Sequence, residues 1–281
     1  MLSSGIPKRE EYLRLETEPL YGDLLAFSRE FEQRCEADTR SVRSYRKKWV
    51  QDPFNQWSRR WEYVYTAQRF QEWATGRQGR LKVIDAGSGF TFFPFYLLKA
   101  NSGLEVDCFD ADPTVGEALQ NTVGFLDRDP NFVLEDLEGL GQDDDSYDAV
   151  YSVSVIEHTK SPQKVIDEIN RVLKPGGVFI CTFDISFESR SPMHTRHVAK
   201  LIDHIVSTFD VGSAPEPVSI ESSPENSVIV TSQWNVEAVR TGLPWRQPLL
   251  VWVYDALRGR FRKSLYRPMT FCCLTVFGKQ V

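Results

Sequence analysis

The sequence lacks any long uncharged apolar segment. None of the apolar runs in its 281 residues reaches the roughly 18 residues that a membrane-spanning helix needs, so we expect no membrane association. It also lacks a basic excess: the net charge of −6 argues against a nucleic-acid partner. A hydrophobic fraction of 41% and a charged fraction of 26% are typical of a soluble globular protein with a full core.

Cysteine and histidine are scarce and carry no ligand spacing. The five cysteines include no CxxC pair, and Cys108 and Cys181 lie in apolar runs, where cysteine acts as a small hydrophobic residue. Their odd number and the absence of a secretory signal predict a reducing, cytoplasmic setting. His194, His197 and His204 lack a supporting acid or cysteine pattern, so we expect no metal site.

Residues 81–184 alternate between strand and helix patterns. The apolar runs predict strands at 81–84, 104–109, 131–134, 147–153 and 178–183. The segments between them predict helices at 92–98, 113–119 and 162–173. Such alternation is typical of an α/β domain, in which parallel strands are joined by helical crossovers on both faces of the sheet.

The flanks of this region have weaker patterns. Before it, the spacing of apolar residues predicts one helix at 20–36 and another that carries Trp57 and Trp61 on one face. After it, we expect a helix at 196–209 and a polar loop at 211–228. A short strand at 228–231 and a closing strand at 268–277 complete the prediction.

The most informative stretch is 81–91, where a buried strand ends at Asp85 and the turn that follows contains Gly87 and Gly89. A strand, a glycine turn and a helix are how an open α/β sheet holds a nucleotide-like ligand. Asp110 and Asp136 follow the next two strands. The carboxyl ends of parallel strands line one crevice, so we expect the three carboxylates to face the same ligand.

The charge of this region narrows the choice of ligand. Residues 81–180 hold 18 acidic and 7 basic residues, a net charge of −11. Such a surround suits a cationic or neutral ligand better than a polyphosphate. The glycine turn also lacks the third glycine of a dinucleotide fingerprint, because Phe92 stands at that position. Both features argue against a dinucleotide.

Four segments, in this order, resemble the class I S-adenosylmethionine-dependent methyltransferases of the small-molecule type. They are Val-Ile-Asp-Ala-Gly-Ser-Gly at 83–89, Val-Asp-Cys-Phe-Asp-Ala-Asp at 106–112, Asp136 through Asp148, and Val155-Ile-Glu-His158 through Arg-Val-Leu-Lys-Pro-Gly-Gly177. The resemblance implies a Rossmann-like sheet of seven strands with the last antiparallel. It also implies that residues 81–281 form the methyltransferase domain, with a core at 81–184 and an acceptor-side insertion at about 185–230. Residues 1–80 would then be a helical extension that lids the cofactor.

The resemblance assigns cofactor contacts residue by residue. Gly87 and Gly89 would approach the methionine part of S-adenosylmethionine, with Asp85 and the Ala86 backbone nearby. Asp110 would hold the ribose hydroxyls. The remaining contacts would be Ala111 packed on the adenine, Asp136 accepting from its amino group, the Leu137 N–H facing the ring, and Ser152 in the floor below the sulfonium.

Residues outside the cofactor motifs are less clearly assigned. His158 follows the fourth strand and is the best candidate for a general base, with a structural hydrogen bond as the alternative. Arg60 could pair with the cofactor carboxylate, and Trp57 and Trp61 could form a wall of the acceptor pocket, although core packing explains them equally well. We therefore expect methyl transfer to an oxygen or nitrogen of a small metabolite.

Other functions remain open at this point. The basic run at 40–48 would suit a protein or RNA substrate. The same fold could also serve a non-methylating reaction or a scaffold role.

Overall fold

The computed structural model describes residues 1–35, 54, 56–122, 124–188, 191, 193–211, 253, 257–258 and 269–279. The basic run at 40–48, the expected strand at 228–231 and nearly all of the expected loop at 211–228 lie outside these residues. In the part of the chain that is described, no helix is long and apolar enough to cross a membrane.

Six strands form one sheet in the order β3-β2-β1-β4-β5-β6. They are β1 (Leu81–Ala86), β2 (Leu104–Asp110), β3 (Asn131–Leu134), β4 (Tyr147–Val153), β5 (Leu173–Ser186) and β6 (Met269–Phe277). The first five pair in parallel, and β6 runs antiparallel to β5. The predicted α/β fold with an antiparallel last strand is therefore confirmed. The described residues form six strands, however, where seven were expected.

Most helices lie where the periodicity predicts them, but the helix predicted to carry Trp57 and Trp61 begins only at Arg59, so Trp57 precedes it. The helices are α1 (Arg9–Leu13), α2 (Pro19–Cys35), α4 (Arg59–Ala74), α5 (Phe93–Ala100), α6 (Pro113–Gln120), α7 (Pro162–Val172) and α8 (Thr195–Thr208), with short 3-10 turns η1 (Leu15–Thr17) and η3 (Ile156–His158). Proline opens α6 and α7, where its missing N–H has no intrahelical partner to lose. At α7 the Ser161 side chain makes no cap hydrogen bond.

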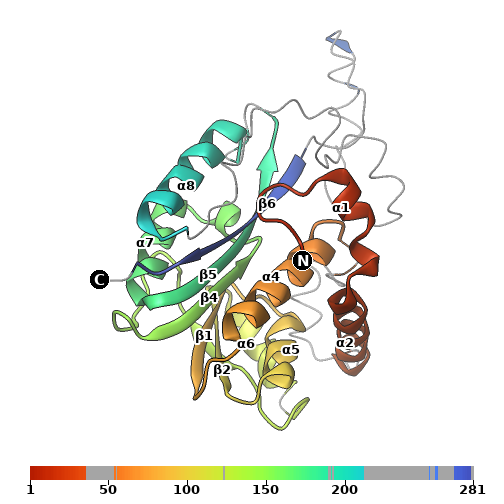
Figure 1. Ribbon diagram of the computed structural model, residues 1–281, viewed down its shortest axis with the longest axis vertical. Coiled ribbons are helices and arrows are strands. Elements are labelled where there is room, and N and C mark those ends of the chain that lie inside the picture. The colour runs from red at the N-terminus through yellow and green to blue at the C-terminus, as the bar shows by residue number, and fades with distance from the viewer. Residues whose placement is uncertain are drawn as a thin grey trace.

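Helices cover both faces of the sheet, as Figure 1 shows. On one face α7 and α8 bury a stripe of aliphatic residues against β4 and β5. On the other, α2, α4, α5 and α6 share a second core with β1, β2 and β4. Because β1 and β4 are covered on both sides, their residues read as continuous apolar runs instead of alternating ones.

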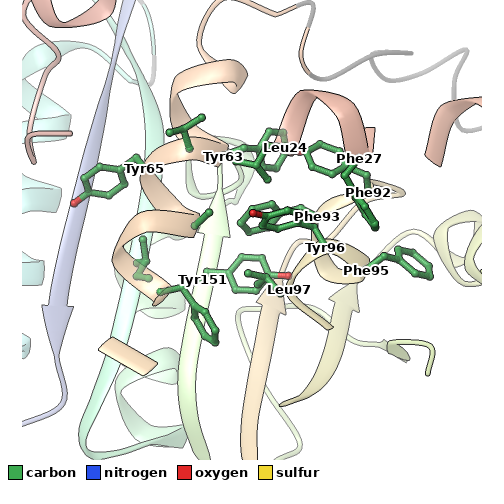
Figure 2. Close-up of a cluster of buried hydrophobic side chains, with 14 of the residues drawn as sticks. Leu24, Phe27, Tyr63, Tyr65, Phe92, Phe93, Phe95, Tyr96, Leu97 and Tyr151 are labelled. Carbon is green, nitrogen blue, oxygen red and sulfur yellow. The ribbon is translucent and has the colours of Figure 1, made fainter. Parts of the chain in front are cut away.

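Aromatic side chains join the N-terminal helices to the sheet (Figure 2). Phe27 of α2 packs edge-on against Tyr96 of α5, with ring centroids 5.6 Å apart. Tyr63 of α4 contacts Phe93 at 5.0 Å, and Phe93 in turn meets Tyr151 of β4 at 5.3 Å. Such pairs contribute about 0.5–1.5 kcal/mol each beyond simple burial. The helices before residue 81 thus share one hydrophobic core with the sheet.

The first residues of the chain also attach to the last strand. Gly5 exchanges two backbone hydrogen bonds with Cys273 of β6, at 2.7 and 3.0 Å. Tyr65 of α4 bonds to the hydroxyls of both Ser4 and Thr275 at 2.8 Å. The first residues of the chain are therefore held to the last strand beside α4, and Arg59 and Glu62 at the start of this helix reach Ser154, the residue after β4.

Candidate functional site

A cavity of about 1010 Å³ opens at the carboxyl ends of β1, β2 and β4. Its lining includes Asp85, Gly87, Gly89, Asp110, Ala111, Asp136, Leu137 and His158, all of which were predicted as site residues. Four separate segments of the chain, between residues 85 and 158, contribute these side chains. The parallel sheet brings them together because its carboxyl ends share one edge.

The glycine turn after β1 forms the centre of the cavity wall. Gly87 and Gly89 have φ of 76° and 53°, in the left-handed region that favours glycine. A Cβ atom at Gly87 would also lie 2.3 Å from Cγ1 of Val155. The turn is held to β2, because Gly87 N–H donates to the carbonyl of Phe109 at 2.8 Å. Any side chain at Gly87 would therefore disturb both the turn and the segment after β4.

Asp110, at the end of β2, is held in place by the backbone around it. One carboxylate oxygen accepts from the N–H of Gly89 at 2.9 Å, and the other accepts from the N–H of Asp112 at 2.8 Å. Burial raises the pKa of Asp110, and these two backbone hydrogen bonds oppose that shift. Each oxygen keeps a lone pair for a ligand hydroxyl, so the group is oriented before a ligand binds.

Asp85 is the most perturbed acid that lines the cavity. It is 5% exposed, and burial, assisted by the charge of Asp110, raises its pKa to about 8. A carboxyl group in this state gains a strong stabilising partner when a cation enters the cavity. The position therefore favours a ligand that carries positive charge near the glycine turn.

The loop after β3 holds Asp136 and Leu137 at the cavity. Glu138, which sequence reasoning did not single out, accepts from the N–H groups of Lys160 and Ser161, both at 2.9 Å. Within the loop, Asp136 accepts from the Glu138 N–H at 3.0 Å. Glu138 therefore ties this loop to the start of α7. It also satisfies the Ser161 N–H at the start of that helix.

Several predicted residues lie away from the cavity. Trp57 and Trp61 are both 0% exposed and pack with Tyr12 in the core. Arg60, whose side chain is mostly buried, donates to the Phe54 carbonyl and pairs with Glu16 at 3.3 Å. These placements do not match a role in the acceptor pocket or at a cofactor carboxylate.

Ser152 and Ala86 lie beneath the cavity lining. The Ser152 hydroxyl is fully buried and donates to the Ala86 carbonyl at 3.1 Å, which ties β4 to β1. Neither residue is among the described residues that line the cavity.

Arg59 lines the cavity where Arg60 was expected. Its guanidinium pairs with Glu62 of α4 at 2.8 Å. Although burial opposes it, the Glu62 charge raises the pKa of Arg59. Sequence periodicity could not select between Arg59 and Arg60, because residues 61–67 of α4 are all buried and leave no polar stripe to mark its direction.

Two further carboxyl groups surround Arg59. Glu157 of η3 accepts from the Asp184 N–H at 3.1 Å, and burial raises its pKa to about 7 while Arg59 opposes the shift. Burial, together with the charges of Glu157 and Glu62, raises the pKa of Asp184 well above its usual range. One oxygen of Glu157 and one of Asp184 are buried without a hydrogen-bond partner. Three carboxyl groups thus surround one guanidinium.

His158 closes η3 at the edge of the cavity. Burial of the ring and the nearby positive charge of Arg59 both lower its pKa. Both effects favour the neutral imidazole, which is the form that can accept a proton. Among the described residues, no group of three or more His, Cys, Asp or Glu side chains is arranged to hold a metal ion.

Comparison with known proteins identifies the central region. Residues 84–181 match a family model described as a methyltransferase domain. The sarcosine/dimethylglycine N-methyltransferase of Aphanothece halophytica is 31% identical over 121 residues, which are 41% of this chain and 40% of that protein. The demethylmenaquinone methyltransferase of Clavibacter sepedonicus is 47% identical over 85 residues, 30% of this chain and 34% of that protein. The chain thus spans less than half the length of these curated relatives.

One solved structure shares the fold at low sequence identity. It is phosphoethanolamine N-methyltransferase 2 of Haemonchus contortus in complex with S-adenosyl-L-methionine. It is 16% identical, with a TM-score of 0.50 over 78% of this chain and 52% of that chain.

Proposed function

Because residues 84–181 form a class I S-adenosylmethionine-dependent methyltransferase domain, we propose that the chain is an enzyme that transfers a methyl group from S-adenosylmethionine to an oxygen or nitrogen atom of a small molecule. The observation that carries this proposal is the convergence of Asp85, Asp110 and Asp136 on one cavity beside a glycine turn. When bound, the cofactor supplies an electrophilic methyl group on a positively charged sulfur.

The residues of the cavity fit such a cofactor along its whole length. In this proposal Asp136 and the Leu137 N–H bind the adenine, and Ala111 packs on its ring. Asp110, held by two backbone N–H groups, accepts from both ribose hydroxyls. At the glycine turn the buried Asp85 carboxyl balances the ammonium group. A neutral cofactor would leave this acidic wall without a partner.

We assign the cofactor carboxylate to Arg59. Its guanidinium lines the cavity and uses one N–H on Glu62 and another, at 3.5 Å, on the Ser154 carbonyl. The other donors form no hydrogen bond with the residues that the structure describes, and in this proposal they bind a carboxylate in the forked geometry typical of arginine. This assignment replaces the one made for Arg60 from sequence.

The N-terminal helices act in this proposal as the lid of the cavity. Gln56, Arg59 and Tyr63 all line it, and the start of α4 contacts Ser154 at the carboxyl end of β4. A lid excludes water and helps to align the acceptor with the methyl group. This alignment is the main source of rate enhancement in a displacement at carbon. Small-molecule pockets measure about 300–1,000 Å³, so a cavity of about 1010 Å³ has room for the cofactor together with a small acceptor.

The relatives support a small acceptor. Their names specify sarcosine or dimethylglycine in one case and demethylmenaquinone in the other. His158 at the cavity edge remains a candidate base for an acceptor that must lose a proton. The region from 185 to about 230, described only to residue 211, is our proposed acceptor side.

Calorimetry with S-adenosylmethionine and S-adenosylhomocysteine tests the cofactor assignment. Wild type should bind both ligands, and Asp110→Ala should bind them at least 10-fold more weakly through loss of a charged hydrogen-bond acceptor. Arg59→Gln should lose affinity for S-adenosylhomocysteine but not for 5′-methylthioadenosine, which has no carboxylate. Arg60→Gln is the matched control and should bind both as wild type does.

Two outcomes would contradict the proposal. If wild type binds neither S-adenosylmethionine nor S-adenosylhomocysteine, the cofactor assignment is wrong. If Arg59→Gln loses equal affinity for S-adenosylhomocysteine and 5′-methylthioadenosine, only the assignment of the carboxylate to Arg59 is wrong. Incubation with sarcosine, catechol, hydroquinone and ethanolamine, followed by mass spectrometry, then tests for gain of one CH₂ unit. Lack of transfer to any acceptor in such a panel would count against a small-molecule methyltransferase.

A further inference from the structure

Ser154, the first residue after β4, lies in the cavity wall with its backbone firmly held. It is 4% exposed and has φ of 51°, an unfavourable conformation for any residue other than glycine. Its N–H bonds to both the carbonyl and the hydroxyl oxygen of Thr182, at 3.0 and 3.1 Å. Strained residues persist where their surroundings determine the conformation, and they cluster at active sites.

The direction of the Ser154 hydroxyl is set by Glu62. Its Oγ donates to Oε1 of Glu62 at 2.8 Å. Because the single O–H proton is used in this bond, the oxygen can act toward the cavity only as an acceptor. A molecule held against Ser154 must therefore offer an N–H or O–H group.

Glu62 is a fully buried carboxylate that accepts from both Ser154 and Arg59. It is 0% exposed, and its second oxygen accepts from Arg59 at 2.8 Å. Protonation of Glu62 would normally leave the Arg59 charge unpaired, which is costly in a buried site. Here Glu157, whose pKa burial raises only to about 7, also faces Arg59, so its carboxylate can pair with the guanidinium when Glu62 becomes neutral.

We propose that Ser154 and Glu62 are the proton-accepting pair of the methyl-transfer site, an inference that rests on the function proposed above. The nucleophilic atom of the acceptor forms a bond to the methyl carbon as the bond from that carbon to sulfur breaks, and the electron pair stays on sulfur. The proton of the acceptor passes to Oγ of Ser154, whose own proton moves to Oε1 of Glu62. Glu62 returns the proton to solvent after the product leaves.

This pair is better placed than His158. His158 is only partly buried, whereas Ser154 and Glu62 are almost completely buried, so competing water weakens their hydrogen bond less. Because the Ser154 oxygen can only accept a hydrogen bond from the cavity, it also selects nitrogen and oxygen nucleophiles that carry a hydrogen. The proposal therefore narrows the acceptor to primary or secondary amines, phenols and alcohols.

The pH response of the pair depends on its charged neighbours. The titratable and charged groups that face it are Tyr12 on α1, Arg59 and Tyr63 on α4, Glu157 and His158 on η3, Asp184 on β5 and Cys273 on β6.

Kinetics of Glu62→Gln and Ser154→Ala, with an acceptor that wild type methylates, test the inference. Each change should lower kcat about 100-fold, the usual scale of general base catalysis, and should abolish the rise of kcat with pH. Affinity for S-adenosylhomocysteine by calorimetry should match wild type. Glu72→Gln is the matched control, because Glu72 pairs with Arg69 at the same spacing on α4 but outside the cavity; it should behave as wild type.

The possible outcomes distinguish failure of the proton-accepting pair from failure of the proposed methyl-transfer function. Unchanged kcat and pH profile in both variants, with cofactor binding intact, would overturn the pair alone. Loss of the pH-dependent rise in His158→Gln, but not in Glu62→Gln, would assign the base to His158 and also overturn it. If wild type methylates no acceptor, the proposed function fails and the pair with it. Should Glu62→Gln fail to bind S-adenosylhomocysteine, Ser154→Ala decides the question.

Discussion

Replacement of Gly87 by alanine should destabilise the protein through two separable effects. With φ of 76°, an alanine would adopt a left-handed conformation that costs about 1–2 kcal/mol. Its Cβ would also lie 2.3 and 2.6 Å from the two methyl groups of Val155, and such overpacking costs about 1–3 kcal/mol. The sum, about 2–5 kcal/mol, is a large share of the roughly 5–15 kcal/mol that stabilises a typical domain.

Two other glycines separate the contributions. Gly124 has φ of 83°, but a Cβ at this position would have no neighbouring atom within 4 Å, so Gly124→Ala should show only the conformational cost. Gly139 has neither a positive φ nor a near neighbour, so Gly139→Ala should stay within about 1 kcal/mol of wild type.

Urea unfolding followed by circular dichroism measures all three variants, with the same slope against urea expected for each. Calorimetry with S-adenosylhomocysteine should show weakened binding only for Gly87→Ala. If Gly87→Ala unfolds at the same urea concentration as Gly124→Ala, the contact with Val155 carries no cost. If Gly87→Ala unfolds at the same urea concentration as Gly139→Ala, the positive φ carries no cost either.

Three further predictions concern titration and reactivity. Burial raises the pKa of Asp85 to about 8 from 3.8, so its contribution to stability is fully present below pH 3.8 and is lost as the pH rises to about 8. Urea unfolding across that range should therefore show a smaller loss of stability in Asp85→Asn than in wild type. An equal loss in the two proteins would contradict the raised pKa. The pKa of His158, lowered by burial and by Arg59, should rise in Arg59→Gln when followed by NMR of the imidazole, and an unchanged value would exclude the Arg59 charge as a cause. All five cysteines are free and buried, so a thiol reagent should react slowly with the native protein and rapidly after unfolding; a fast native thiol would mean that one of them is accessible.

The glycine turn and the acids that surround it were accessible from sequence because their signals are local. An apolar strand, a glycine pair and an acidic residue at each strand end are patterns of a few residues. Parallel strands then bring Asp85, Asp110 and Asp136 to one edge without further information. The antiparallel last strand came from family resemblance and is confirmed.

The residues near the methyl acceptor could not be identified from local sequence patterns. Trp57 and Trp61 have helical spacing, but spacing does not reveal whether a helix turns that face to the core or to a cavity, and both proved to be core residues. Arg59 and Arg60 differ by one position, which is about 100° around a helix. The sequence therefore pointed to Arg60 for the cavity, whereas Arg59 lines it.

The sequence by itself determined the α/β class, the cofactor motifs and the acidic character of the central region, because each depends on residues that are close together in the chain. Only the tertiary structure decided that Ser154, Glu62 and Arg59 meet. Ser154 and Glu62 are separated by 92 positions, and they come into contact because aromatic packing and the first residues of the chain hold α4 against the sheet, with its start at the carboxyl end of β4. Contacts between distant segments depend on the packing of whole elements, which no local pattern encodes.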